Sequence, residues 1–136
     1  MLYKIAHILR DKFPWIWDII GIINSFLFGL RYGSKMKNVQ NILSHFTKTT
    51  DEAGNALFYR IESLGKDNLP MLAKMFAEQP ASAFDFFKPH GFDELSLNKL
   101  AKDKSFLAYI VVAEGTVQQK VCVGYFFQRS FFWGKS

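Results

Sequence analysis

The chain has 136 residues, 49% of them hydrophobic and 17% aromatic, so it can bury a core of its own and is not intrinsically disordered. Its net charge of +5 comes from lysines and arginines spread along the sequence. No block of like charge suggests a nucleic-acid arm, and we expect no nucleic-acid partner. The single cysteine, Cys122, excludes an intrachain disulfide and a multi-cysteine metal site, which indicates a reducing, cytoplasmic compartment. His7 and His45 have no partner at ligand spacing, so no metal site is predicted.

The first 46 residues predict a helical appendage. Apolar residues recur at helical spacing over Phe13–Leu30 and again over Met36–Phe46. Pro14 suits the first turn of a helix, and Gly33 suits its end. One predicted stripe is apolar and consists of Ile16, Ile19, Ile20, Ile23, Leu27 and Leu30. Asp18 and the small residues Gly21, Ser25 and Gly29 fall on another face.

Two interpretations of Phe13–Leu30 stay open at this point. A membrane span is disfavoured, because a helix of this length reaches only about 27 Å against a bilayer core of about 30 Å, and it would carry Asp18 and Asn24. Basic flanks and terminal aromatic residues suit a membrane surface, which would place the protein peripherally at the inner face. The small-residue face would equally allow close packing against protein.

From Thr47 onward the sequence changes character. Thr47–Asn55 is polar and predicts a linker. The elements expected over 56–136 are a strand at Ala56–Leu64, a helix from a capping Asp67 to Gln79, an aromatic loop at Ala81–Phe92, a helix from a capping Asp93 to about Asp103, and strands at Ser105–Ala113 and Gln119–Trp133. This order predicts an α+β fold, with an antiparallel sheet and helices on one side.

Three segments of this second part resemble the GNAT family of acyltransferases. YRIESLGKDNLPMLAKMF is similar to the first strand and helix of these proteins, and KVCVGYFFQR is similar to their third strand. FFKPHGF, at Phe86–Phe92, is similar to a segment of GNAT proteins that act on bacterial surface sugars. The resemblance runs from Phe58 to Ser136 and implies the N-terminal half of a GNAT-like domain, a partial β-α-α-β-β unit. It further implies acyl transfer to an amino sugar or nucleotide sugar, with acetyl-CoA as cofactor.

One part of the GNAT pattern is missing from this sequence. In these proteins a glycine-rich loop at a helix N-terminus holds the pyrophosphate of acyl-CoA. The 136 residues contain no Gly-x-Gly, and Gly134–Ser136 falls about where a fourth strand is expected. We therefore expect this chain alone to lack the acyl-CoA-binding half and to be inactive. It would be a truncated domain or a half-domain completed by another chain.

The resemblance makes His90, Phe87 and Phe92 candidate substrate-binding residues, because GNAT proteins commonly receive the acceptor at this loop. The alternatives are that the His90 ring caps a turn and that the phenylalanines form a loop core. Glu62 and Glu78 qualify as general bases by residue type alone. No catalytic residue is assigned.

The strand Gln119–Trp133 has apolar residues on both sides. Alternation places Val121, Val123, Tyr125 and Phe127 on one face, and Cys122, Phe126 and Phe132 on the other. Such a strand needs a neighbour on each edge, so we expect its free edge to pair with a second copy or a completing chain, or to be covered by the N-terminal helices. An alternative function is a non-catalytic interaction module, with the N-terminal helix contacting a membrane or a partner.

Overall fold

The computed structural model describes residues 8, 11–43, 47–50, 52, 54–85, 89–115 and 119–132. Its elements are α2 (Pro14–Leu43), β1 (Thr47–Thr50), β2 (Ala56–Ser63), α3 (Leu69–Ala77), the 3-10 helix η1 (Ala81–Phe84), α4 (Glu94–Lys102), β3 (Phe106–Gly115) and β4 (Val121–Arg129). The four strands form one antiparallel sheet in the order β1-β2-β3-β4. The predicted α+β class, with an N-terminal helix and an antiparallel sheet, is confirmed.

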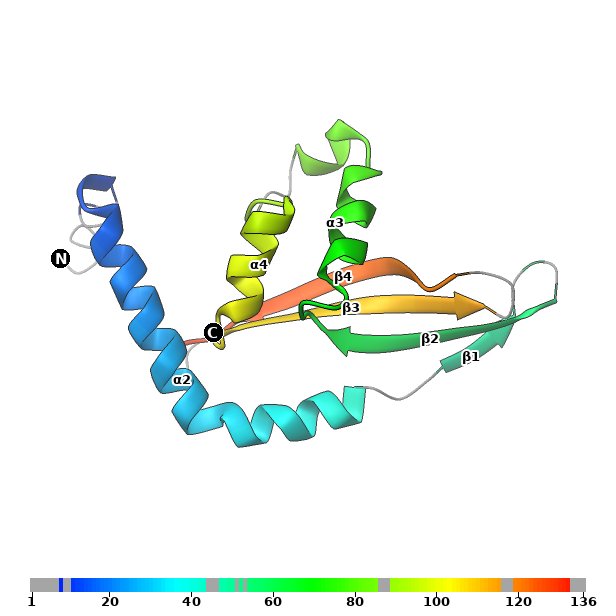
Figure 1. The fold of residues 1–136 in the computed structure, drawn as a ribbon, viewed down its shortest axis with the longest axis horizontal. Coiled ribbons are helices and arrows are strands. Elements are labelled where there is room, and N and C mark those ends of the chain that lie inside the picture. Colours follow the sequence, from blue (N-terminus) through cyan, green and yellow to red (C-terminus); the bar gives the residue numbers. More distant parts are fainter. Residues whose placement is uncertain are drawn as a thin grey trace.

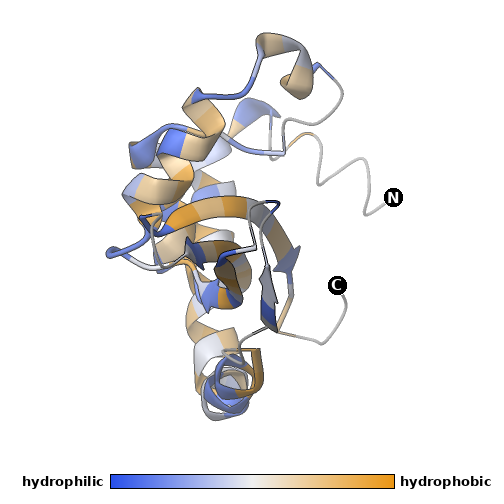
Figure 2. Ribbon diagram, turned by 90° about the vertical axis from the view of Figure 1, so that its right-hand side faces the viewer, coloured by the Kyte–Doolittle hydropathy of each residue, from blue (hydrophilic) through white to orange (hydrophobic). Residues whose placement is uncertain are grey.

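The sheet lies between two helical layers. Figures 1 and 2 show α3 and α4 on one face of the sheet and the second half of α2 on the opposite side. Hydrophobic residues are concentrated in the sheet between these layers (Figure 2). The helices α3 and α4 were both predicted to lie on one side of the sheet, and they do.

The core lies between β3 and the pair α3 and α4. Leu72 of α3, Leu97 of α4, and Ile110 and Val112 of β3 are each 0% exposed. Burial of each such side chain stabilises the fold by about 1.5–3 kcal/mol relative to leaving it exposed. Because β3 pairs with a strand on each edge and is covered by this layer, it holds more of the core than any other described strand.

The starts of α3 and α4 differ in how they are capped. Asp93 caps α4 as predicted, accepting a hydrogen bond from the Ser96 N–H at 2.9 Å. The predicted cap of α3 by Asp67 is wrong, because Asn68 occupies that position and makes no side-chain capping bond. The Asn68 amide is engaged elsewhere: it donates to the Ser63 carbonyl at 2.9 Å and accepts from the Gly65 N–H at 2.9 Å.

The helix α2 is longer than predicted. It runs for 30 residues through Gly33, so the expected end at that glycine is wrong. Gly33 has no positive φ, and nothing there terminates the helix. Figure 1 shows α2 bending partway along its length, and the helix contains the Gly33-Ser34 pair, a type of sequence at which helices commonly bend. No helix within the described ranges combines the length and the apolar character needed to cross a bilayer.

The small-residue face of α2, and not its apolar stripe, contacts the rest of the chain. The Ser25 hydroxyl accepts a hydrogen bond from the Lys104 N–H at 2.8 Å, and the Lys104 side chain lies against Gly29, so that it would have to shift for a larger residue there. Asn24 and Phe28 are the buried residues of the helix. Close packing through small residues therefore occurs within this chain.

Two differences concern the sheet. The expected linker at 47–55 contains β1, which pairs with β2. A β-bulge at Val111/Val112 shifts the pairing of β3 with β4. Cys122 is then opposite Val112 and Tyr125 is opposite Ile110, so both lie on the face that α3 and α4 cover. The predicted placement of Cys122 and Tyr125 on opposite faces is wrong, because the bulge adds one residue to the alternation.

Candidate functional site

The loop before α4 places His90 over β4. Its Nδ1 lies 2.8 Å from the Gly91 carbonyl oxygen, and its Nε2 lies 2.8 Å from the Tyr125 hydroxyl. A carbonyl can only accept, so Nδ1 carries the proton, and in the corresponding neutral tautomer Nε2 accepts from the Tyr125 hydroxyl. Both ring nitrogens of His90 are thus engaged.

Aromatic rings surround this pair. The His90 ring centre lies 5.1–5.8 Å from those of Phe92, Phe106, Tyr125 and Phe127, and each contact is edge-on. Burial raises the pKa of the Tyr125 hydroxyl, which stays protonated and donating at neutral pH. The geometry makes His90 and Tyr125 a link between the loop and β4.

The three predicted substrate-binding residues have different outcomes. His90 bonds to the Gly91 carbonyl in its own turn, as the turn-capping alternative expects. It also contacts the Tyr125 hydroxyl on β4, which was not predicted from the sequence. Phe92 packs against Phe76 and Phe84, with ring centres 4.3 and 4.7 Å apart, as the loop-core alternative expects. Phe87 lies outside the described residues.

Phe92 also has an outer surface. Together with Phe76, Phe84 and Ala73 it lines an apolar depression of about 390 Å³ between α3 and the loop. This depression and the His90–Tyr125 pair lie at the same loop. Sequence reasoning missed Tyr125, because the pair is 35 positions apart and the bulge in β4 conceals which face Tyr125 occupies.

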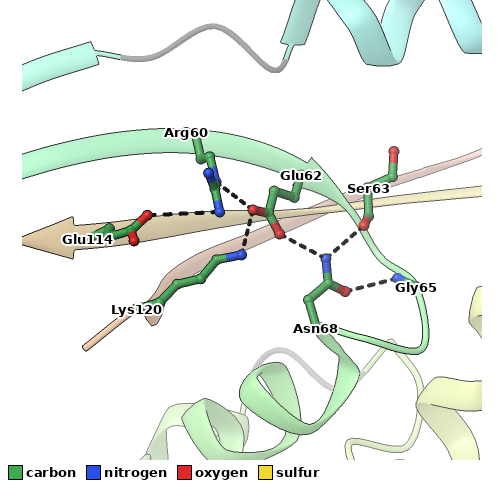
Figure 3. Close-up of polar contacts among 7 residues, drawn as sticks. All are labelled: Arg60, Glu62, Ser63, Gly65, Asn68, Glu114 and Lys120. Carbon is green, nitrogen blue, oxygen red and sulfur yellow. Dashed lines mark hydrogen bonds and ion pairs between the residues drawn. The ribbon is translucent and has the colours of Figure 1, made fainter.

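A polar cluster on the same face of the sheet centres on Glu62 (Figure 3). Its carboxylate accepts from Arg60 at 2.5 Å, from the Lys120 ammonium at 2.8 Å and from the Asn68 amide at 3.2 Å. Glu114 adds a longer ion pair to Arg60, at 3.9 Å. Asn68 precedes α3, so the cluster fastens the start of that helix to β2 and β4.

The electrostatics of the cluster argue against a general base. Partial burial by itself raises the pKa of Glu62, but the hydrogen bonds from Lys120 and Asn68 and the charges of Lys120 and Arg60 together hold it below its usual value. A carboxylate with a lowered pKa is a weak base at neutral pH. The other candidate, Glu78, is exposed at the C-terminal end of α3 and pairs with Lys74 at 3.8 Å.

A cavity of about 500 Å³ lies between α2 and the opposite face of the sheet. Its lining includes polar residues from both sides: Ser34, Lys37 and Gln40 of α2, Ser63 of β2, Tyr109 of β3, and Lys104. Sequence reasoning missed this site, since it requires α2 to fold back over the strands.

Two hydroxyls of this cavity lining come from the strands, and one of them is buried with no hydrogen-bond partner in the described part of the chain. The Ser63 hydroxyl is buried without one, and Figure 3 shows it turned away from the cluster at Glu62. Ser63 is directly opposite Tyr109 in the pairing of β2 with β3. The Tyr109 side chain is 7% exposed, and burial raises the pKa of its hydroxyl.

Cys122 is a buried thiol on the α3 and α4 face. It lies 3.6 Å from the Met75 sulfur, and burial raises its pKa although its contact with the Gly124 carbonyl opposes this. A thiol with a raised pKa is a poor nucleophile.

Comparison with known protein families, with curated proteins and with solved structures found no match to this chain.

Proposed function

We propose that residues 56–132 form part of the acceptor side of a GNAT-like acyltransferase. The observation that carries this proposal is the order strand, helix, helix, strand, strand, in which β2, β3 and β4 are sheet neighbours and α3 and α4 share one face. The resemblance of the sequence to GNAT segments implies the same order. The proposed acceptor is an amino sugar or a nucleotide-linked amino sugar.

Within this proposal the acceptor binds at the loop that carries His90. The depression beside Phe84 and Phe92 offers an apolar surface for a sugar ring, and His90 and Tyr125 hold the loop against β4. Because both ring nitrogens of His90 are engaged, its role is to position the loop. No catalytic residue is proposed.

Calorimetry with this chain tests the proposal. Amino sugars and their nucleotide-linked forms are titrated in turn, with acetyl-CoA as a parallel titrant. We expect saturable binding of at least one acceptor. We expect no tight binding of acetyl-CoA, because the 136 residues contain no Gly-x-Gly phosphate loop. Micromolar affinity for acetyl-CoA, or no affinity for any acceptor, contradicts the proposal.

A second candidate function is membrane-surface attachment through α2, and one specific observation favours it. At about 3.6 residues per turn, the buried Asn24 and Phe28 lie on one side of the helix. Large apolar residues that are 46–71% exposed cluster on roughly the opposite side: Trp15, Ile19, Ile22, Ile23, Phe26 and Leu30. We call these six residues the outer stripe. Packing within the described part of the chain therefore leaves the outer stripe exposed and able to contact a partner outside the chain.

The charges around the outer stripe favour an anionic bilayer as its partner. Lys12, Arg31, Lys35 and Lys37 are exposed on α2 or just before it, and the chain has a net charge of +5. A second copy of this chain would bring the same positive charge to the interface. Apolar residues flanked by basic ones are typical of helices that lie in the headgroup region of anionic membranes.

Vesicle co-sedimentation tests this second function with a matched pair of variants. Ile22 on the outer stripe and Leu95 on α4 are 68% and 67% exposed. We expect binding to phosphatidylglycerol vesicles and little binding to phosphatidylcholine vesicles. Ile22→Glu should reduce binding severalfold and Leu95→Glu should not. Equal effects of the two substitutions, or equal binding to both lipids, contradict attachment through the outer stripe.

A further inference from the structure

The cavity between α2 and the sheet has the size and the walls of a ligand site. Its volume of about 500 Å³ lies within the range of about 300–1,000 Å³ that is typical of small-molecule pockets. Phe28 and Met36 of α2, with Leu64 and Leu107 near the sheet, supply apolar wall. This site lies on the opposite side of the sheet from His90, so it does not depend on the proposed acceptor loop.

A buried hydroxyl without a partner marks one end of the cavity. Ser63 and Tyr109 are cross-strand neighbours, and within the residues described the buried Ser63 hydroxyl has no hydrogen-bond partner. Buried polar groups in native proteins are normally paired, because an unpaired one costs free energy. The buried Ser63 hydroxyl without a partner therefore favours a polar group in this part of the cavity.

The charged residues that line the cavity indicate whether the bound polar group is an anion or a cation. Lys37 and Lys104 are exposed, and neither has an ion pair in the ranges described. The carboxylate in the lining, Asp103, is already engaged: it accepts from the Ser105 N–H at 2.9 Å and from the Ser105 hydroxyl at 2.6 Å. Lysines and hydroxyls together favour an oxyanion.

We infer that this cavity binds a small amphiphilic anion, with a carboxylate or phosphate head and an apolar body. The head is held by Lys37 and Lys104 and by the hydroxyls of Ser63 and Tyr109. The apolar body lies against Phe28 and the other hydrophobic wall residues. Free amphiphiles and membrane lipids share this chemistry, and the experiment separates them.

Gly33 provides a way to fill the cavity. It lines the cavity, and a Cβ added to it meets no atom within 4 Å. Gly21, on the same helix, also has open space around an added Cβ, but it does not line the cavity. The variants Gly33→Leu and Gly21→Leu are thus matched in helix propensity and differ in whether the leucine occupies the site.

The test is calorimetric titration of the full chain with decanoate and with decyl phosphate, each below its micellar concentration. We expect saturable one-to-one binding to the wild type and to Gly21→Leu. Gly33→Leu should weaken it by at least tenfold while keeping a wild-type circular dichroism spectrum. Equal binding to the two leucine variants overturns the inference, and so does the absence of amphiphile binding to the wild type together with the absence of vesicle binding that depends on Gly33.

A second set of variants tests the head group without changing the core. The double variant Lys37→Gln/Lys104→Gln should bind decanoate about tenfold more weakly, as expected when charged hydrogen-bond donors are lost. Lys99→Gln, an exposed lysine of α4 that does not line the cavity, should have no effect. Equal effects of the double variant and Lys99→Gln contradict an oxyanion site at Lys37 and Lys104.

The source of the ligand is decided with vesicles. Decanoate binding in their absence assigns the cavity to a free amphiphile. Binding of the wild type to phosphatidylglycerol vesicles that is lost in Gly33→Leu and kept in Gly21→Leu assigns it to a lipid instead. If Gly33→Leu and Gly21→Leu both still bind vesicles and neither binds decanoate, the vesicle binding is due to the outer stripe. That result overturns the cavity inference.

Discussion

The side-chain carbonyl of Asn24 accepts a hydrogen bond from the backbone N–H of Phe132 at 2.9 Å. The same side-chain amide donates to the Ser130 carbonyl at 3.3 Å. Asn24 therefore bonds to one backbone carbonyl and one backbone N–H of the segment that follows β4. Asn24 is 6% exposed. These contacts join two parts of the chain more than 100 positions apart.

The first prediction concerns this contact. Asn24→Ala should lower the free energy of unfolding by about 1–3 kcal/mol, because it leaves backbone groups near Phe132 without partners. Asn38→Ala, at an exposed position of the same helix, should change it by less than about 0.5 kcal/mol. Urea denaturation measures both. Equal effects of the two substitutions would show that Asn24 does not hold α2 to the sheet.

The start of α3 gives a second prediction. Asn68 is 8% exposed and makes three hydrogen bonds, whereas Asp67 is exposed. Asn68→Ala should destabilise the protein by about 1–3 kcal/mol, and Asp67→Ala by less than about 0.5 kcal/mol. Thermal unfolding measured by circular dichroism checks the ranking. A larger loss for Asp67→Ala would restore Asp67 as the cap of this helix.

A third prediction is the pH dependence of the cluster at Glu62. A carboxyl whose pKa is lowered in the folded state stabilises that state above its unfolded pKa, about 4.3 for Glu, and loses this contribution as the pH falls through the folded value. Glu62→Gln should cost about 1–2 kcal/mol at neutral pH. The difference in free energy of unfolding between Glu62→Gln and the wild type should become smaller below about pH 4.

The control for Glu62 is Glu78→Gln, which removes an exposed pair with Lys74. It should cost less than about 0.5 kcal/mol at any pH. Denaturation at several pH values compares both variants with the wild type. A Glu62→Gln deficit that is the same at pH 3 and pH 7 would mean that the ionised carboxylate does not stabilise the fold.

The free edge of β4 gives a fourth prediction. In the described part of the chain β4 pairs with β3 alone, and Val121, Val123 and Phe126 are 41–51% exposed. An unpaired, apolar edge favours pairing with another chain. Sedimentation velocity should show association that grows with concentration, and Val123→Lys should weaken it.

Leu95→Lys is the control for edge pairing, since Leu95 is exposed on α4, away from β4. It should leave association unchanged. A monomer at tens of micromolar contradicts edge pairing outright. Association abolished equally by Leu95→Lys would place the contact elsewhere.

Local signals in the sequence predicted local structure. The strand β2 and the cap of α4 depend on residues within a few positions, and both are present in the fold. The predicted cap of α3 by Asp67 was wrong because Asn68 takes the N-cap position, and the Asn68 amide bonds to Glu62, Ser63 and Gly65 and not to the helix. A propensity rule cannot include such a partner.

Long-range features were not predictable in the same way. The β-bulge in β4 lies beside Gly124, a residue type that can mark a bulge but does not fix where the alternation shifts, and the bulge decides that Tyr125 faces His90. The outward direction of the apolar stripe of α2 stayed open at the level of the sequence, because small residues and apolar residues are both able to pack. Asn24 and Ser25 decide the outcome by bonding to Phe132 and Lys104.

The acceptor site is the central claim, and an NMR titration of the labelled chain with the tightest amino-sugar ligand tests it most directly. The account predicts that the largest amide shifts occur at Gly91, Phe92 and Tyr125, and that Tyr125→Phe weakens binding severalfold by releasing the loop. Tyr59→Phe, on β2 and away from the loop, should bind normally. Shifts confined to α2, or no shifts with any amino sugar or nucleotide-linked form, would contradict an acceptor site at the His90 loop.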